Sequence, residues 1–300
     1  FLRAREGVAM RQFPLAQLVC EQSYKPFADE LARGGLQVVA DASESGVRYA
    51  VVLVLPPRQR EEARALFARA LSLCAPGGVV VASITNNEGA KSGESDLKQL
   101  AGLGGSLTKN HCRVFWSKPL HDAHDAALLE QWNRLDAPRS ILGGRFTSRP
   151  GVFAWDRIDP ASALLVEHLP ANLAGKGADL GAGYGYLSAE ILSRSTQVTA
   201  LDLYEAEARA LALARQNLST FEAQATLVYR WHDAFAAHSR ALLERRNPSR
   251  ARELNLLAAN LLARSFPVEA LSHAVRVGAG ELAVEIIRRS WLRLILESET

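Results

Sequence analysis

Long apolar blocks alternate with amphipathic ones near the start of the chain. Residues 47–55 (VRYAVVLVL) form an apolar, β-branched run, as expected of a buried parallel strand. Residues 59–74 carry apolar side chains at helical spacing, which predicts an amphipathic helix. Residues 75–78 (APGG) indicate a turn before a strand over 79–84. The order strand, helix, strand predicts an α/β unit.

A polar stretch over 86–95 is predicted to be a loop, followed by a helix near 95–101 and a short strand over 112–116. We therefore expect residues 1–120 to form one α/β domain, although no glycine-rich nucleotide-binding loop occurs in it. Residues 121–145 contain turn-forming Pro and Gly positions and are expected to connect this domain to the next.

The alternation of strand and helix patterns repeats over residues 146–235. The predicted elements are a helix at 160–168 capped by Asp159, a strand at 177–180, a helix at 185–193, a strand at 197–202, a helix at 205–218 and a strand at 225–229. Strands that alternate with helices favour a parallel sheet that binds its ligand at the carboxyl ends of the strands.

The clearest chemical signal lies in this second block. Asp179-Leu180-Gly181-Ala182-Gly183-Tyr184-Gly185 reads as a strand end followed by a glycine loop that opens a helix. Asp202 is predicted to close the next strand. The separation fits the roughly 20 residues expected between a nucleotide-binding glycine loop and the acid that binds ribose hydroxyls. Glycines there let a ligand approach the backbone closely.

The details of the loop favour a positively charged ligand. A dinucleotide fingerprint needs G-x-G-x-x-G, but position 186 is Tyr. A carboxylate at Asp179 repels a pyrophosphate and suits a ligand with an ammonium and a sulfonium group, which indicates S-adenosylmethionine. An NAD-dependent enzyme and a glycine turn that serves only packing are the alternatives. Asp233 follows the third strand, where it either contacts an adenine amino group or caps a loop.

Bulk properties narrow the function class. The 300 residues carry a net charge of only +3, so an RNA partner would need a local basic surface. Three cysteines without C-x-x-C spacing argue against zinc and disulfides and favour a reducing, cytoplasmic location. No apolar run is long enough to span a bilayer, and no secretory signal is visible. The run His121-Asp122-Ala123-His124-Asp125 is read as a solvated helix start rather than a metal site.

Residues 236–300 differ in composition from the rest. The stretch 237–265 is rich in Ala, Leu and Arg with few β-branched residues, which predicts helix. The segment around Gly278-Ala279-Gly280 is predicted to be a hairpin. The arginines of this tail either contact RNA phosphates or form a solvated helix face; they are Arg240, Arg245, Arg246, Arg250 and Arg252.

Two α/β units in tandem, of which only the second keeps a glycine loop, resemble the ribosomal RNA small-subunit methyltransferase C family. The most specific stretch is 150–159 (PGVFAWDRID), which looks like the family's lead-in to its catalytic domain. The resemblance implies two tandem Rossmann-like methyltransferase-type domains, the first degenerate and used for substrate binding and folding. It also implies a cytoplasmic enzyme, expected to be a monomer, that methylates a guanine exocyclic amine of 16S rRNA in the small ribosomal subunit.

The same resemblance assigns roles to individual residues. Asp179, Gly181 and Gly183, with Gly185 completing the loop, would line the methionine part of S-adenosylmethionine. Asp202 would hold the ribose, and Asp233 would face the adenine.

The family's catalytic motif is missing, however. The family carries N-P-P-F or N-P-P-Y at the end of a fourth strand, and this chain has only Asn247-Pro248-Ser249, among arginines. The second domain is therefore expected to have an incomplete or altered C-terminal half, with a tail that is divergent, rebuilt or read in a changed frame. No catalytic residue is assigned. The alternative function is a catalytically inactive relative that binds S-adenosylmethionine or RNA, and a protein-glutamine or free-base methyltransferase is a weaker alternative.

Overall fold

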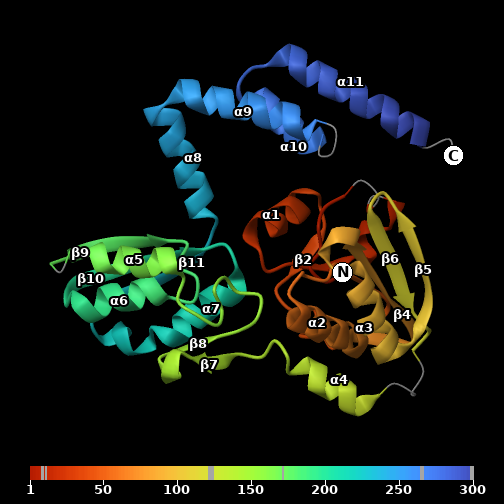
Figure 1. The fold of residues 1–300 in the computed structure, drawn as a ribbon, viewed down its shortest axis with the longest axis horizontal. Helices are drawn as coiled ribbons and strands as arrows, with labels where there is room; N and C mark the ends of the chain where they lie inside the picture. Colours follow the sequence, from red (N-terminus) through yellow and green to blue (C-terminus); the bar gives the residue numbers. More distant parts are fainter. Residues whose placement is uncertain (8–9, 11, 121–124, 171, 264–266, 298–300) are drawn as a thin grey trace. The chain divides into compact units, whose positions relative to one another are not determined.

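The computed structural model describes residues 1–7, 10, 12–120, 125–170, 172–263 and 267–297 (Figure 1). The chain falls into two compact units, Phe1–Ala234 and Phe235–Thr300. Within the described residues, the strands all belong to the first unit, and the second unit is helical.

A four-stranded sheet occupies the first half of the first unit. Its strands lie in the order β3-β4-β6-β5; β3 and β4 are parallel, and β6 is antiparallel to both of its neighbours. The bounds are Tyr49–Val54 for β3, Cys74–Thr85 for β4, Leu103–Lys109 for β5 and Cys112–Ser117 for β6. A separate parallel pair joins β1 (Val19–Glu21) to β2 (Gln37–Val39).

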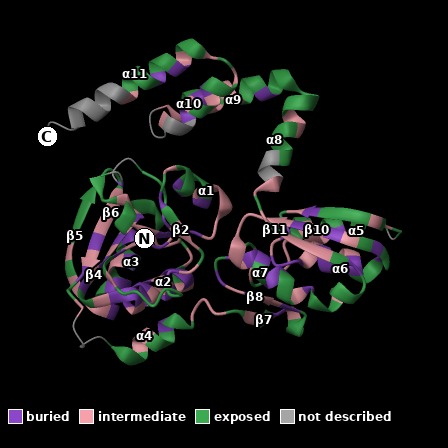
Figure 2. Ribbon diagram, turned by 180° about the vertical axis from the view of Figure 1, so that it is seen from behind, coloured by how far each residue is buried: buried purple, intermediate pink, exposed green. Residues whose placement is uncertain are grey.

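Helix α2 (Arg60–Leu73) supplies much of the apolar core beside this sheet. Its first turn is capped by Gln59, whose side chain accepts a hydrogen bond from the backbone of Glu62. Figure 2 marks many residues of α2 as buried, and Phe67 packs in one cluster with Phe115 of β6. The other helices of this half are α1 (Lys25–Arg33), α3 (Ala90–Ala101) and α4 (Ala126–Asn133).

Three local predictions for this half are wrong. The predicted loop over 86–95 is a short 3-10 turn followed by α3, which begins at Ala90. The predicted turn at 75–78 lies within β4, where the pairing with β3 shifts register. Strand β5 was not expected, because Gly104 and Gly105 are poor strand formers. A Cβ at Gly105 would lie 2.4 Å from the Trp116 ring, so the glycine makes room for that ring.

The second half of the first unit contains a parallel three-stranded sheet in the order β11-β10-β9. A short antiparallel pair precedes it, formed by β7 (Arg139–Ile141) and β8 (Phe146–Ser148). Its elements are α5 (Pro160–His168), β9 (Ala174–Leu180), α6 (Tyr186–Arg194), β10 (Gln197–Glu205), α7 (Ala208–Asn217) and β11 (Thr226–Trp231). As predicted, Asp159 caps α5, by accepting a hydrogen bond from the Ser162 backbone at 2.9 Å.

One face of this sheet is packed and the other is open. Val198, Leu201 and Leu203 of β10 are buried in one cluster with residues of α6 and α7. Asp202 and Tyr204, which alternate with them along the strand, are only partly buried. The loops at the carboxyl ends of these strands therefore stand on a sheet that is packed on one side.

Strand β9 pairs with β10 alone among the described residues, so it forms an edge of the sheet. Most of its residues, including Lys176 and Ala178, are exposed. After β11, the described chain continues only as helices. The fourth strand that the family carries is thus not found in the part of the chain that the structure describes.

The second unit is built from α8 (Ala234–Arg246), α9 (Pro248–Leu262), α10 (Pro267–Arg276) and α11 (Gly280–Glu297). A small core of Ala259, Ala270, Ala274 and Ile286 holds the last three helices together. The helix predicted over 237–265 is confirmed in type, although it is divided at Asn247.

The hairpin predicted around Gly278 is wrong. That segment joins α10 to α11, and Gly278 has φ +67° at the end of α10. Its backbone N–H donates to Val275, and Ala279 donates to Ala274, which closes the helix end in the usual way for a glycine. Within the described residues, no helix combines the length and apolar character needed to cross a membrane.

Candidate functional site

The glycine loop connects β9 to α6 as expected. Gly183 has φ +56°, and a Cβ built on it would meet no described atom within 4 Å. Gly185, with φ +92°, would instead bring its Cβ to 3.3 Å from Ala214 and Leu218. Gly183 therefore leaves the backbone open to a ligand, whereas Gly185 lets the start of α6 pack against α7.

Asp179 lies beneath this loop rather than in it. Only 7% of its surface is exposed, and its carboxylate accepts a hydrogen bond from the Ser188 hydroxyl at 2.6 Å. Burial raises the pKa of Asp179, the Ser188 hydrogen bond opposes this, and the charge of Glu205 raises it further. Asp179 is thus an acid held under the loop by α6, next to a second acid.

The predicted strand end at Asp202 is wrong, because β10 continues to Glu205. In the pairing of β10 with β9, Asp202 lies opposite Ala178, the residue that precedes Asp179. The carboxylate of Asp202 accepts hydrogen bonds from Arg230 at 2.9 and 3.1 Å, on the open face of the sheet. The Asp202 carboxylate is thus engaged in an ion pair with Arg230.

Glu205 is the acid at the end of β10. One of its carboxylate oxygens accepts a hydrogen bond from the backbone N–H of Gly183 at 2.8 Å. The other accepts from the backbone N–H of Glu207, also at 2.8 Å. Sequence reasoning missed Glu205, although Leu203 and Tyr204 are strand formers that extend the pattern past Asp202.

Asp233 follows β11 at the same edge of the sheet. Its charge, with that of Glu205, contributes to the raised pKa of Tyr24, after the larger effect of burial. The carboxyl ends of the three parallel strands therefore carry three acids, Asp179, Glu205 and Asp233, of which Glu205 is bonded to Gly183 and lies close enough to Asp179 to raise its pKa. Such a group favours a cation or a donor of hydrogen bonds and disfavours a phosphate.

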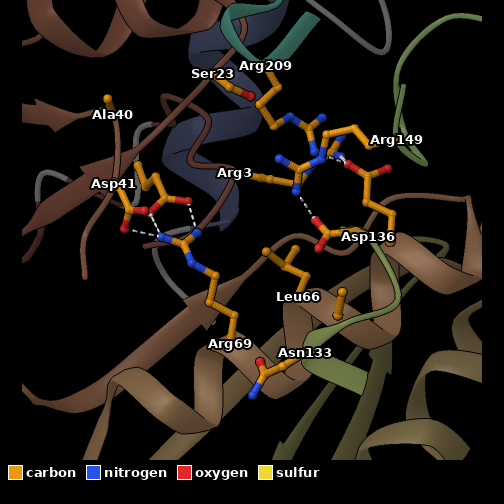
Figure 3. Close-up of a pocket in the computed structure, with 13 residues that line it drawn as sticks. Arg3, Ser23, Ala40, Asp41, Leu66, Arg69, Asn133, Asp136, Arg149 and Arg209 are labelled. Atoms are coloured by element: carbon orange, nitrogen blue, oxygen red, sulfur yellow. Dashed lines mark hydrogen bonds and ion pairs between the residues drawn. The ribbon is translucent and has the colours of Figure 1, made fainter. Parts of the chain in front are cut away.

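A charged cavity of about 230 Å³ lies elsewhere in the first unit (Figure 3). Its arginines are matched by acids: Arg69 with Glu21 and Asp41, Arg149 with Asp136, and Arg3 and Arg209 with Glu62. Because these charges neutralise one another, the cavity is not a ready anion site. It does not include the glycine loop or Glu205.

A larger cavity of about 580 Å³ lies at the carboxyl ends of β3 and β4. Tyr24 and Phe27 line it, with ring centroids 5.0 Å apart. The guanidinium of Arg5, which is exposed, lies 3.4 Å from the centroid of the Phe27 ring. This combination of cation and aromatic surface is typical of sites that stack a base.

The remaining candidates are explained by local structure. Residues 121–124 of the predicted helix start lie outside the described residues, and Asp125 caps α4 by accepting from the Leu128 backbone at 2.9 Å. No group of three potential metal ligands occurs among the described residues. Asn247 of the remnant-like triplet caps α9, with its side chain accepting from the Arg250 backbone at 3.0 Å.

The tail arginines differ in their surroundings. Arg250 pairs with Glu253 at 2.7 Å, and Arg252 donates to the backbone carbonyl of Val277 at 2.5 Å. Arg240, Arg245 and Arg246 are exposed on α8. Part of this group is therefore used to hold the helical unit together.

Comparison with known proteins places these features in context. Residues 143–244 match the model of the Methyltransferase small domain. Ribosomal RNA small subunit methyltransferase C of Psychromonas ingrahamii is 26% identical over 184 residues, which cover 60% of this chain and 52% of the relative. The protein of the same name from Salmonella newport is 31% identical over 163 residues, covering 54% and 46%. The chain thus spans about half the length of the curated relatives it matches.

The T. thermophilus 16S rRNA N2 methyltransferase, solved in complex with AdoMet and guanosine, has a similar fold. The TM-score is 0.57 at 20% identity, and the match covers 72% of this chain and 59% of that chain. This similarity confirms the mixed α/β fold. The resemblance predicted from the sequence is confirmed: residues 143–244 match the Methyltransferase small domain, and the chain is similar to ribosomal RNA small subunit methyltransferase C.

Proposed function

We propose that this chain binds S-adenosylmethionine at the glycine loop and acts in the methylation of a guanine exocyclic amine of 16S rRNA. The observation that carries the proposal is the meeting of Gly183 and Glu205 at the ends of β9 and β10. The space that a Cβ at Gly183 would fill is open, and the acids nearby suit an ammonium and a sulfonium group. The residues present therefore fit this cofactor.

The site residues have distinct proposed roles. Gly181, Gly183 and Gly185 shape the loop that receives the methionine part. Asp233 faces the adenine amino group. Asp179 acts from beneath the loop, where the Ser188 hydrogen bond holds it near the ligand's ammonium.

We assign the ribose hydroxyls to Glu205 rather than to Asp202. Glu205 lies at the strand end and already accepts a backbone hydrogen bond from the loop. Asp202 lies within the strand and is paired with Arg230. A carboxylate can accept two hydroxyl hydrogen bonds, so vicinal ribose hydroxyls are a matched partner for Glu205.

The first half of the unit is proposed to be a degenerate second copy of the methyltransferase fold that contacts RNA. The cavity with Arg5, Tyr24 and Phe27 supports this role, because an unpaired base can stack on such a surface. We accordingly propose two domains, at 1–120 and 146–235, joined by a connector at 121–145 and followed by a helical tail at 236–300. A cytoplasmic, monomeric protein acting on the small ribosomal subunit is the expected setting.

Bound at the loop, S-adenosylmethionine supplies an electrophilic methyl group. The chain's own contribution is to hold the donor and the acceptor in line, which accounts for most of the rate in direct transfers. No described residue can be assigned the role of the family's N-P-P-F motif, because Asn247 caps α9. That observation favours a second candidate function, a relative that binds the cofactor or RNA without transferring the methyl group.

A methyl-transfer assay separates the two candidates. Isolated small ribosomal subunits lacking the modification are incubated with the full chain and S-adenosylmethionine labelled in its methyl group. Label in a guanine of 16S rRNA supports the enzyme. Cofactor binding by calorimetry without labelled RNA supports the inactive relative, and binding of NAD alone contradicts both.

A further inference from the structure

A short segment of the first half pairs with the loop that follows β10. The backbone N–H of Ala208 donates to the carbonyl of Ser23 at 2.9 Å, and that of Lys25 donates to the carbonyl of Ala206 at 2.8 Å. Tyr24 and Glu207 thereby form an antiparallel bridge. Two residues about 180 positions apart in the sequence thus share a strand-like contact beside Glu205.

The indole of Trp231 closes this contact. Its N–H is shared between the carbonyl oxygens of Ala206, at 2.8 Å, and Ser23, at 3.0 Å. Trp231 is the last residue of β11, and His232 after it donates its backbone N–H to the carbonyl of Glu205 at 3.0 Å. One side chain therefore bonds both sides of the bridge from the end of a neighbouring strand.

The contact leads directly to the Glu205 carboxylate. Ala206 is the next residue in the chain, and the backbone N–H of Glu207 donates to one oxygen of that carboxylate. Glu207 is fixed in turn, because its carboxylate accepts from Arg209 and Arg209 also contacts Glu62 of α2. The orientation of Glu205 is thus set by the 23–25 segment as well as by the glycine loop.

We propose that Trp231 is a positioning residue that joins the first half of the unit to the 205–208 loop and so sets Glu205 for the ribose hydroxyls. This inference rests on the proposed cofactor site. It gives the first half a role in recognising the cofactor, in addition to any contact with RNA. Loss of the indole N–H leaves the backbone bridge between Tyr24 and Glu207 in place. It removes the hydrogen bonds from Trp231 to the carbonyls of Ser23 and Ala206.

The test compares two ligands that differ only in the ribose. S-adenosylhomocysteine and its 2′-deoxy analogue are titrated calorimetrically into the full chain. We expect the wild type to prefer the intact ribose by about tenfold, because a hydrogen bond to a charged group contributes about 1.5 kcal/mol. Trp231→Phe keeps an aromatic ring without the N–H donor, and we expect it to reduce this preference at least threefold.

Two further variants make the result specific. Trp132→Phe changes a buried tryptophan that packs in the core of the first half and should leave the preference unchanged. Lys25→Pro removes the other N–H that donates to Ala206, at the first position of α1, where proline is well tolerated. We expect it to reduce the preference as Trp231→Phe does, and it serves as the independent test if Trp231→Phe does not fold.

The outcomes separate the inference from the proposed function. Equal weakening of both ligands in both variants, or an unchanged preference, contradicts the positioning role while leaving the cofactor site intact. A wild type that binds neither ligand contradicts the proposed function itself. In the double variant Trp231→Phe with Glu205→Gln, a loss no larger than that of Glu205→Gln alone supports action through Glu205.

Discussion

Two acids of one strand, Asp202 and Glu205, have different surroundings. Asp202 is partly exposed and bonded to Arg230, whereas Glu205 is bonded to the backbone of the glycine loop. The difference arises because β10 runs three residues further than its first acid. The spacing from the glycine loop was compatible with either residue, so only the strand end distinguishes them.

We expect Glu205→Gln to weaken S-adenosylmethionine binding about tenfold or more. The reason is the loss of charged hydrogen bonds to ribose, each of which contributes about 1.5–3 kcal/mol. Asp202→Asn is the matched control and should stay within about twofold of the wild type, because an exposed ion pair contributes little. Calorimetric titration measures both; the reverse order of effects would return the ribose role to Asp202.

Asp179 gives a prediction on pH. Burial raises its folded-state pKa above the unfolded value of about 3.9, so the native state binds more protons in that interval. Protonated Asp179 therefore stabilises the folded state at low pH, and this stabilisation is lost as the pH rises above about 4. Asp179→Asn keeps an acceptor for Ser188 and should remove this loss. Urea unfolding across a pH series checks it, and identical pH slopes for both proteins would contradict it.

At the scale of single residues, sequence reasoning identified the loop but not every function in it. The Asp-Leu-Gly-Ala-Gly pattern was sufficient to place a β-to-α junction at 180–186, which the structure confirms. The burial of Asp179 under α6 could not be inferred, because it depends on the packing of Ser188 from the next helix. Trp231 gave no local signal, since both its partners are distant in the chain.

Among elements, α2 and α7 are joined by one buried acid. Glu62, which is 4% exposed, accepts from Arg209 of α7 at 2.8 Å and from Arg3 at 3.1 Å. The lead-in segment at Gly151 also packs here, since a Cβ on Gly151 would lie 2.3 Å from the Glu62 carboxyl. The buried charge of Glu62 and its two arginine partners therefore contribute to the contact between the two halves of the first unit.

We expect Arg209→Met to reduce the free energy of unfolding by about 3 kcal/mol. Removing one partner of a buried ion pair leaves the other charge poorly compensated, here that of Glu62. Arg134→Met is the control, because its pair with Glu130 is exposed on α4 and should change stability by less than about 0.5 kcal/mol. Chemical unfolding measures both, and equal effects would contradict the role assigned to Glu62.

The elements that sequence patterns predicted well are those with strong local signals. Helix α5 has a capping Asp159 and a Pro at its first position, and both its start and its approximate end were predicted correctly. Strand β5 was missed because glycine is a poor strand former. The glycines of β5 leave room for the Trp116 ring, which local sequence patterns do not reveal. The helices around Gly278 were misread because short apolar runs do not by themselves distinguish strand from helix.

Because the whole molecule divides into two compact units, a mutation can be directed at the core of the second unit alone. Ala274 is fully buried in the small core of α9, α10 and α11. We expect Ala274→Asp to unfold these helices, because it buries an unpaired charge. Circular dichroism should show the loss of helix, while S-adenosylmethionine binding by the first unit stays within about twofold. A parallel loss of cofactor binding would mean that the second unit takes part in the site.

The proposed cofactor site is tested most sharply by a crystal structure of this chain soaked with S-adenosylhomocysteine. Our account predicts ligand density over Gly183, with the ribose hydroxyls within hydrogen-bonding distance of the Glu205 carboxylate. A ribose bound at Asp202, a dinucleotide in the loop under the same conditions, or no ligand at a concentration that saturates binding would contradict it.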